Sequence, residues 1–351
     1  MADNGEQPAA GEIVRGVLAA FGLGAPCEVW PLGGTASPKW GVMANGQRWV
    51  VRVRPAEFAD DASVRFDHQI LRQLRSAGFP VPDPQARSDG STVLEVVGGR
   101  VCEVLRWLDG EPFPDGNCDA LRALGTFLAR WHQTLAGELP GNTAEAVPKK
   151  RNALREDHPQ LMERYLAALG ELATNPSDRR QLEQLALQLD RVGSELDAGL
   201  YQCLPQTIIH GDLHPGNLRF RQTQVAAVYD FDYLSVQARA RDVSDAIMFF
   251  ASRREGTTDY NDIRSLTRPL EPDLRLCQSL LEGYCGVAPL ESDEWEALPQ
   301  LIRSRWLQIR LRGARKVPQN EKLRFVLDEF FVVIDWLDRE ADDFFEELRQ
   351  A

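Results

Sequence analysis

The sequence predicts an α+β protein of two unequal lobes, and three observations support this. The chain has 351 residues, about twice the length of an ordinary domain. Its first 110 residues contain short apolar runs separated by turn signals, among them the hairpin dipeptide Asn45-Gly46. Beyond Gly110, apolar residues recur three and four apart, as in buried helix faces. We therefore expect a small sheet-containing lobe over residues 1–108 and a larger, mainly helical lobe over 109–351.

Composition and charge exclude several classes of protein. Apolar residues make up 43% of the chain and charged residues 26%, as in soluble globular proteins. A net charge of -12 disfavours a nucleic-acid partner, because such proteins neutralise phosphates. The six scattered cysteines form no CxxC pair, so we expect neither a zinc site nor a disulfide scaffold. No apolar run is long enough to cross a bilayer and the first residues resemble no secretory signal, so we expect a cytoplasmic protein without a membrane partner.

The first lobe should contain five strands and one inserted helix. A short amphipathic helix that ends at Gly22 precedes the first strand. A turn is expected at Gly33-Gly34-Thr35 between the first two strands, and three prolines between 80 and 84 end the inserted helix. The expected strands are 28–32, 40–44, 48–53, 92–97 and 101–107, and the inserted helix is 63–77.

The second lobe should be helical around a small β element. Two short strands, 207–209 and 225–229, flank the segment His210–Asn217. The expected helical stretches include 121–135, 182–196, 298–316 and 321–349.

The segment His210-Gly211-Asp212-Leu213-His214-Pro215-Gly216-Asn217 carries the chemistry. Asp212 and Asn217 lie five residues apart on a tight Pro-Gly loop, and Asp230 follows the apolar strand 225–229. Phosphoryl transfer needs one carboxylate to orient a hydroxyl, and oxygen ligands that hold Mg²⁺ on the phosphates. The alternative is that His210 and Asp212 only stabilise a turn.

HGDLHPGN followed by VYDFD resembles the signature of the aminoglycoside phosphotransferase/choline kinase family, and the resemblance extends over nearly the whole chain. It implies a protein-kinase-like fold, with a five-stranded antiparallel sheet lobe before a larger helical lobe. It implies ATP, with GTP as an alternative, and Mg²⁺ as cofactors. By this resemblance Asp212 is the catalytic base, His210 organises the loop, and Asn217 and Asp230 are the Mg²⁺ ligands.

The resemblance also implies a nucleotide site in the first lobe. Thr35 and Ser37 would donate to phosphate oxygens, and Trp107 and Leu108 lie in the segment that resembles the adenine-binding hinge. Two positions depart from the family pattern. Its phosphate-binding Lys is replaced by Arg52, with Arg54 next but one, and its partner Glu is replaced by Asp67. Arg keeps the charge and binds phosphate bidentately, so an Arg–Asp pair is expected to serve.

Several other residues each have more than one possible role. His214 is a candidate substrate contact or a turn histidine, and Asp232 is a candidate substrate contact, a ligand of a second ion or a turn cap. Asp242 either braces the loop, as the resemblance suggests, or caps a helix. The basic residues between 303 and 316 either line an anionic pocket or face solvent.

The predicted function is transfer of phosphate from ATP to the hydroxyl of a small molecule. Homoserine-like acceptors are favoured, ahead of choline- and aminoglycoside-like ones. A Ser/Thr protein kinase and a non-catalytic nucleotide-binding regulator are the alternatives. The sequence is compatible with a monomer or a homodimer.

Overall fold

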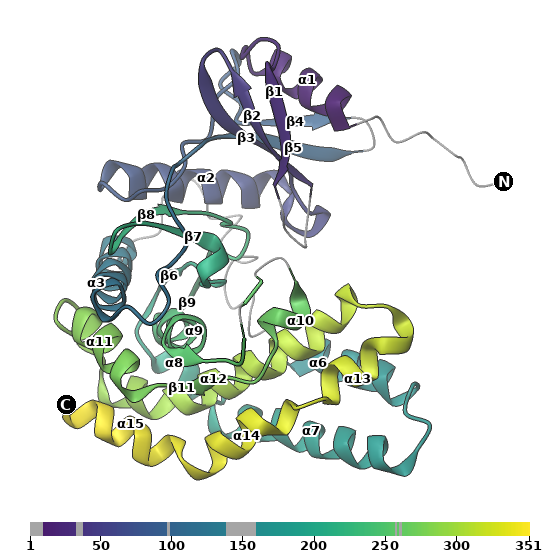
Figure 1. The fold of residues 1–351 in the computed structure, drawn as a ribbon, viewed down its shortest axis with the longest axis vertical. Helices are drawn as coiled ribbons and strands as arrows, with labels where there is room; N and C mark the ends of the chain where they lie inside the picture. The colour runs from purple at the N-terminus through teal and green to yellow at the C-terminus, as the bar shows by residue number, and fades with distance from the viewer. Residues whose placement is uncertain (1–9, 33–37, 97–98, 138–158, 257, 260–261) are drawn as a thin grey trace. The chain divides into compact units, whose positions relative to one another are not determined.

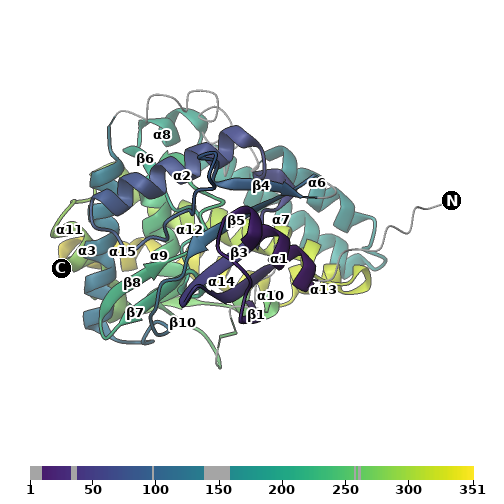
Figure 2. The same cartoon turned by 90° about the horizontal axis from the view of Figure 1, so that it is seen from above.

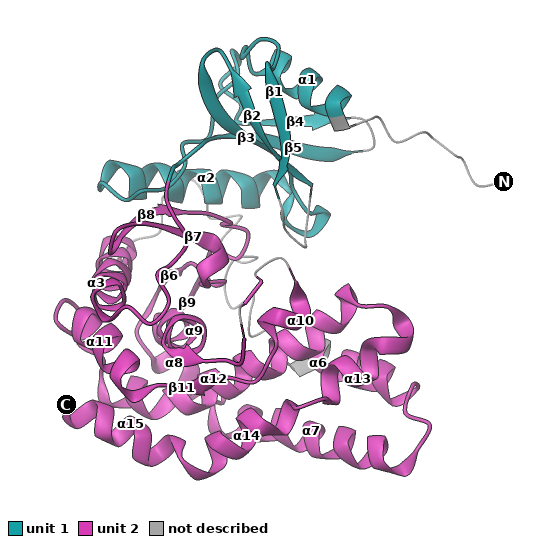
Figure 3. Cartoon of the chain, viewed as in Figure 1, with its two compact units in different colours: residues 1–109 teal, residues 110–351 magenta. Residues whose placement is uncertain are grey.

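The computed structural model describes residues 10–32, 38–96, 99–137, 159–256, 258–259 and 262–351. The chain forms two compact units, residues 1–109 and residues 110–351 (Figure 1 and Figure 3). The sequence analysis places this boundary between residues 108 and 109.

Unit 1 is built on a five-stranded sheet with the order β1-β2-β3-β5-β4, in which every neighbouring pair is antiparallel. Its elements are α1 (Ala10–Ala20), β1 (Glu28–Leu32), β2 (Lys39–Ala44), β3 (Gln47–Val53), the 3₁₀ turn η1 (Ala56–Phe58), α2 (Asp61–Ser76), β4 (Val93–Val96) and β5 (Arg100–Arg106). All five strands and the inserted helix expected from the sequence are present. The left-handed Asn45 and Gly46 form the turn between β2 and β3.

The two faces of this sheet differ in polarity. Because side chains alternate along a strand, Trp49, Val51 and Val53 share one face, where they form a core with α1. Helix α1 packs against β4 and β5 on this side of the sheet (Figure 2). Arg52 projects from the opposite face of β3. Helix α2, whose first turn is capped by Asp60 accepting from the Ser63 N–H, supplies buried polar residues that bond to the sheet.

Unit 2 is mainly helical, and its apolar core runs through most of its helices. The helices are α3 (Cys118–Leu135), α6 (Pro159–Gly170), α7 (Pro176–Glu195), α8 (Ala198–Cys203), α9 (Ala240–Phe250), α10 (Ile263–Leu266), α11 (Leu274–Cys285), α12 (Ser292–Gly313), α13 (Lys322–Leu327), α14 (Phe330–Arg339) and α15 (Ala341–Gln350), with the 3₁₀ turns η3 (Pro215–Asn217), η4 (Ala314–Lys316) and η5 (Gln319–Glu321). Every residue of α9 is buried, so this helix lies in the centre of the unit.

Helices α3 and α11 pack with their backbones in close approach. A Cβ atom at Gly125 would lie 2.0 Å from the Leu280 carbonyl oxygen, and one at Gly283 would lie 2.0 Å from the Arg122 carbonyl oxygen. The Thr126 hydroxyl donates across the same contact to the Gly283 carbonyl at 3.2 Å. Only glycine permits this spacing, because any side chain would collide with main-chain atoms.

Short strands frame the central loop of unit 2. Strand β6 (Gln206–Ile209) pairs with β9 (Ser235–Ala238), and β7 (Leu218–Arg221) pairs with β8 (Gln224–Val228), both antiparallel. The sequence predicted β6 and β8 and missed β7 and β9. A further pair, β10 (Ser252–Arg253) and β11 (Glu271–Pro272), lies between α9 and α11.

The C-terminal stretch expected to be helical over 321–349 is divided into α13, α14 and α15. Glu329, with a left-handed φ of 55°, separates α13 from α14, because such a backbone cannot continue a right-handed helix. Among the described residues, no helix is both long and apolar enough to cross a membrane.

Candidate active site

The loop between β6 and β7 is fixed by the side chain of His210. Its Nε2 lies 2.9 Å from the Tyr229 carbonyl oxygen, and its Nδ1 accepts the Asp212 N–H at 3.3 Å. Because a carbonyl oxygen only accepts, Nε2 carries the hydrogen, and the geometry therefore assigns the neutral tautomer. His210 thus ties the start of the loop to the end of β8.

Asp242, in the first turn of α9, fixes the same loop through hydrogen bonds to two of its backbone amides. Its carboxylate accepts from the His210 N–H at 2.8 Å and the Gly211 N–H at 2.9 Å. His132 Nε2 lies 3.3 Å from the same carboxylate, and His132 Nδ1 lies 2.8 Å from the Tyr284 hydroxyl. Burial raises the pKa of Asp242, but the contact with His132 and the other nearby donors hold it below its ordinary value. The brace expected of Asp242 is therefore present, and His132 is buried with a partner at each ring nitrogen.

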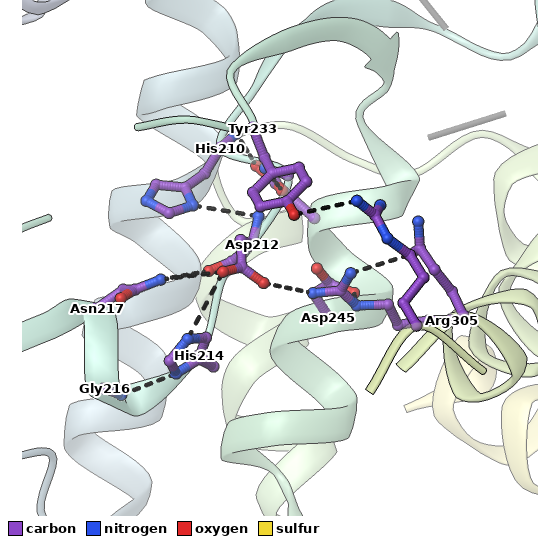
Figure 4. A network of polar contacts seen from close by, with 12 residues as sticks. His210, Asp212, His214, Gly216, Asn217, Tyr233, Asp245 and Arg305 are labelled. Atoms are coloured by element: carbon purple, nitrogen blue, oxygen red, sulfur yellow. Dashed lines mark hydrogen bonds and ion pairs between the residues drawn. The ribbon is translucent and has the colours of Figure 1, made fainter. Parts of the chain in front are cut away.

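Asp212 lies at the centre of a network of polar contacts, as Figure 4 shows. Its Oδ1 accepts from Arg305 Nη2 at 2.7 Å, and its main-chain oxygen accepts from Asn217 Nδ2 at 2.9 Å. Burial raises the pKa of Asp212, but His214 and Arg305 outweigh that effect and hold the pKa well below its ordinary value. Arg305, which is always protonated, is the cation in direct contact with Asp212. The carboxylate is therefore ionised and accepts hydrogen bonds.

Arg305 comes from α12, far from the loop in sequence, and it joins two carboxylates. Besides Asp212, it contacts Asp245 Oδ1 through Nε at 3.1 Å, and its Nη1 donates to Gln308 Oε1 at 3.0 Å. Arg241 Nη2 donates to the same Gln308 oxygen at 2.8 Å. Burial raises the pKa of Asp245 to about 6, although Arg305 and Arg241 act against it. We call Asp212, Arg241, Asp242, Asp245 and Arg305 the Asp212 cluster.

Asn217 and Asp230 lie at the two ends of the β7–β8 hairpin. The Asn217 carbonyl accepts from the Tyr229 N–H at 2.8 Å, which places the residue before Asp230 beside Asn217. Asp230 has a left-handed φ of 63°, a conformation that is costly for a non-glycine residue and recurs at functional sites. Among the described residues, no group of three or more His, Cys, Asp or Glu side chains is placed to hold a metal. An amide and a carboxylate nevertheless suit Mg²⁺, which takes few protein ligands and completes its shell with phosphates and water.

Unit 1 contains a second buried charged group, which we call the Glu103 cluster: Arg52, Arg54, Asp67, His68 and Glu103. Arg54 donates to Asp67 at 2.9 Å and to Glu103 at 3.0 Å, and Arg52 Nη1 lies 3.4 Å from the other Glu103 oxygen. His68 Nε2 lies 2.7 Å from Glu103, which is 1% exposed. Burial raises the pKa of Glu103, but the charge of Arg54 and the hydrogen bond with His68 hold it well below its ordinary range. Asp67 thus forms an ion pair with Arg54, and the pairing of Asp67 with Arg52 expected from the sequence stays a prediction.

The model of the phosphotransferase enzyme family matches residues 29–275, which is most of the chain and includes the loop and both clusters' acidic residues. The chain belongs to the phosphotransferase enzyme family. Membership identifies it as a kinase whose phosphoryl acceptor is a hydroxyl group.

Relatives and solved structures agree with this assignment. A homoserine kinase of Azorhizobium caulinodans is 27% identical over 269 residues, which is 76% of this chain and 74% of that protein. An amicoumacin kinase structure superposes with a TM-score of 0.68 at 17% identity, covering 97% of each chain. The microcompartment-associated aminopropanol kinase gives 0.63 at 17% identity, covering 96% of this chain and 99% of that one. These likenesses confirm the expected protein-kinase-like α+β fold.

The remaining predicted residues of this phosphotransferase lie in several environments. Trp107 Nε1 donates to Asp109 at 3.0 Å, and its ring meets Trp30 edge to face at 5.8 Å between centroids. Leu108 is half-buried, whereas Thr35 and Ser37 lie outside the described residues. The two predicted substrate contacts differ in exposure, since His214 is half-buried and Asp232 is buried. His214 Nδ1 accepts from the Gly216 N–H at 3.1 Å, and Asp232 is 3% exposed.

Sequence reasoning did not identify several members of these clusters, among them Glu103, Asp245 and Arg305. Glu103 lies within an apolar strand, and Arg54 and Arg52 share one strand face, so the pattern does not choose between them. Asp245 lies in a helix that is buried all round, where only a tertiary contact identifies it. Arg305 belonged to a recognised run of basic residues, but nothing in that run pointed to Asp212.

Proposed function

We propose that the protein transfers the γ-phosphoryl group of ATP to a hydroxyl of a small molecule with the help of Mg²⁺, and that Asp212 is the catalytic base. The observation that carries the proposal is an ionised Asp212 on a loop fixed at both ends, with Asn217 and Asp230 on the adjoining hairpin. Phosphoryl transfer depends on positioning and on charge compensation more than on covalent chemistry by the protein.

Asp212 would act chiefly by orienting the attacking hydroxyl. A carboxylate with a lowered pKa is a weak base, but in a loose transition state the hydroxyl loses its proton late. The Arg305 contact fixes Oδ1 of the carboxylate. We assign Oδ2, which lies 3.5 Å from Asn217 Nδ2 and 3.7 Å from His214 Nε2, to the acceptor hydroxyl. Arg305 is thus a positioning residue in this proposal.

The proposed cofactor contacts are assigned to individual residues of each unit. We assign Asn217 and Asp230 as ligands of Mg²⁺, which when bound neutralises charge on the phosphates. Arg54 is fixed between Asp67 and Glu103, so we assign Arg52 to the phosphates. The remaining nucleotide contacts are assigned as the family resemblance implies. The phosphates are assigned to Thr35 and Ser37, and the base to Trp107 and Leu108. The amicoumacin kinase structure was determined with AMP-PNP and Ca²⁺, which supports a nucleotide and a divalent cation here.

The acceptor is proposed to be homoserine-like, ahead of choline-like and aminoglycoside-like molecules. The homoserine kinase relatives support this order, and the aminopropanol kinase shows that an amino alcohol is accepted on the same fold. His214 and Asp232 remain the proposed substrate contacts.

The test is phosphate transfer from γ-labelled ATP to a panel of amino alcohols, hydroxy amino acids, sugars and aminoglycosides. Asp212→Ala should lower turnover about 10²- to 10⁴-fold. Asp343→Ala, at an exposed carboxylate of α15, is the matched control and should keep turnover. Label on protein with no small-molecule product would instead favour the protein kinase, and ATP binding without turnover the regulator.

A further inference from the structure

One face of helix α9 contacts both the loop between β6 and β7 and helix α12. Asp242, Asp245 and Phe249 are spaced three and four apart, so they lie on this face. Asp242 accepts from two backbone amides of the loop. Phe249 lies beside Arg305 of α12, whose guanidinium carbon is 5.8 Å from the centroid of the ring. Asp245 lies between these two residues on the helix and contacts Arg305 as well.

Arg305 has a partner at each of its three nitrogens. Its Nη2 donates to Asp212 Oδ1 at 2.7 Å, its Nη1 donates to Gln308 Oε1 at 3.0 Å, and its Nε lies 3.1 Å from Asp245 Oδ1. Figure 4 shows Asp212, Asp245 and Arg305 in one network. Because a guanidinium is planar and rigid, a change at Nε also changes the direction of Nη2. One side chain therefore connects Asp245 to Asp212.

The Asp245 carboxyl is unusual for a buried group. It is 0% exposed, and neither of its oxygens accepts a hydrogen bond from the part of the chain that the structure describes. Its contact with Arg305 is an ion pair. Asp242 shows the ordinary arrangement, since it is equally buried and accepts from two backbone amides. A buried polar group without hydrogen bonds is costly, and such groups recur at sites of catalysis.

The charged groups near Asp245 come from three elements. Burial raises its pKa to about 6, and Asp242 of α9 and Asp212 of the loop add to this effect. Arg305 of α12 and Arg241 of α9 oppose it. Asp245 therefore takes up a proton between pH 7 and pH 5, whereas Asp212, whose pKa is held well below its ordinary value, stays ionised.

We propose that Asp245 is a positioning residue for phosphoryl transfer, and that its negative charge acts on Asp212 through Arg305. The inference rests on the proposed function, in which Asp212 orients the attacking hydroxyl, and adds a residue to it. When Asp245 is ionised, two carboxylates share the charge of Arg305. When Asp245 is neutral, that charge acts on Asp212 alone, which becomes a weaker base. Turnover should therefore fall as the pH drops through 6.

The alternative is that Asp245 only supports the fold. Loss of a structural carboxylate would lower turnover by the same factor at every pH. Loss of a positioning carboxylate would also remove the pH dependence that its ionisation causes. It would further have no effect once Arg305 is absent. These two differences separate the roles.

The experiment measures kcat for ATP with Mg²⁺ from pH 5 to pH 8, with water as the phosphoryl acceptor and released phosphate as the readout, so that it needs no identified substrate. The ionised fraction of Asp245 is about one-tenth at pH 5, so this carboxyl should lower wild-type kcat about 10-fold between pH 8 and pH 5. Asp245→Asn keeps the size of the side chain and cannot ionise. It should lower kcat at pH 8 about 10- to 100-fold and lack that decrease toward pH 5.

The quantity compared is the ratio of kcat at pH 8 to kcat at pH 5. Titration of ATP contributes equally to wild type and variants, and circular dichroism checks that each protein is folded at both pH values. Ser244→Ala is the matched control, because it removes a buried hydrogen bond to the Arg241 carbonyl at the neighbouring residue of α9. It should keep the wild-type ratio. Any acceptor that proves to be phosphorylated is tested in the same way.

A double-variant cycle tests the connection through Arg305. If Asp245 acts through Arg305, the variant that combines Arg305→Gln with Asp245→Asn should have the same kcat and the same pH ratio as Arg305→Gln alone. If Asp245 acts independently, the two losses should multiply.

Two results overturn the inference and leave the proposed function intact: a wild-type pH ratio in Asp245→Asn, or losses that multiply in the double variant. Undiminished turnover in Asp212→Ala overturns the proposed function itself, as does a wild-type protein that transfers phosphate from ATP neither to water nor to a small hydroxyl compound. A pH ratio that changes in Asp245→Asn but not in Ser244→Ala, with no further loss in the double variant, supports the inference.

Discussion

The Glu103 cluster and the Asp212 cluster both bury arginines with carboxylates. They differ in the direction in which the pKa values of these carboxyl groups are shifted. In the Glu103 cluster, Arg54, Arg52 and His68 surround Glu103, and its pKa is held well below the ordinary range. In the Asp212 cluster, Asp212 has a lowered pKa while Asp245, on the other side of Arg305, has a pKa raised to about 6. Neighbouring carboxylates whose pKa values are pushed apart are typical of reacting sites, whereas mutual neutralisation is typical of structural ones.

The largest effect on stability should come from breaking the Glu103 cluster. Glu103→Ala leaves Arg54 and Arg52 buried without their shared carboxylate, so the free energy of unfolding should fall by about 3–5 kcal/mol. Urea unfolding measures the loss. Glu95→Ala, at an exposed position on the neighbouring strand β4, is the control and should cost under about 0.5 kcal/mol. Equal losses in the two variants would mean that the cluster is not a structural centre.

The Asp245 carboxyl should make stability depend on pH in the opposite direction to Asp212. Its pKa is about 6 in the folded protein and ordinary when unfolded, so the folded state binds the proton more tightly. Its stabilising contribution is therefore full below about pH 4 and is lost as the pH rises through 6, by about 3 kcal/mol. The amide of Asp245→Asn cannot ionise, so this variant should not lose unfolding free energy as the pH rises through 6.

Urea unfolding of the wild type and Asp245→Asn from pH 4 to pH 8 measures the difference. The stability of the variant relative to the wild type should rise with pH across this window. Parallel pH profiles would show that Asp245 does not titrate in this range, and the contrast between the clusters would then rest on geometry alone.

Asp242→Asn should loosen the loop without touching Asp212 directly. An amide offers one acceptor oxygen where the carboxylate serves two backbone N–H groups, so unfolding free energy should fall by about 2 kcal/mol. Turnover should fall as well, because the loop fixes Asp212. Asp119→Asn, at an exposed aspartate in the first turn of α3, is the matched control. A variant that lost stability but kept full turnover would show that the loop geometry does not depend on this brace.

The smallest effect should come from the start of α2, the helix that carries Asp67 and His68. Asp60→Ala removes the N-cap and should cost about 1 kcal/mol by thermal unfolding, and Asp60→Ser should restore most of it. If alanine and serine behaved alike, the side chain of Asp60 would not be acting as a cap.

The sequence predicted contacts that are local and missed those that join distant segments. Asp212 and Asn217 lie five residues apart on one loop, and the structure joins them through an Asn217 hydrogen bond. Arg305 reaches Asp212 from another helix, and no periodicity in α12 distinguishes it from its basic neighbours. The choice between Arg52 and Arg54 was equally open, because a strand places both on one face.

The secondary structure shows the same difference between local patterns, which were predicted, and features that depend on distant segments or on backbone conformation, which were not. The five strands of unit 1 have strong alternation and a clear hairpin signal, and all were predicted. Strand β9 has the sequence SVQA, which contains no strand pattern long enough to recognise, and it exists because β6 pairs with it. Glu329 interrupts the C-terminal helices through its backbone conformation, a property that composition does not reveal.

The close approach of α3 and α11 has a genetic consequence. Gly125 and Gly283 set the distance between these helices, and the same helices carry His132 and Tyr284, which lead to Asp242 and the loop. A methyl group at either glycine would separate the helices and so disturb a site that neither glycine touches. Random mutagenesis with selection for temperature-sensitive loss of activity should therefore recover substitutions at these two glycines alongside those in the loop.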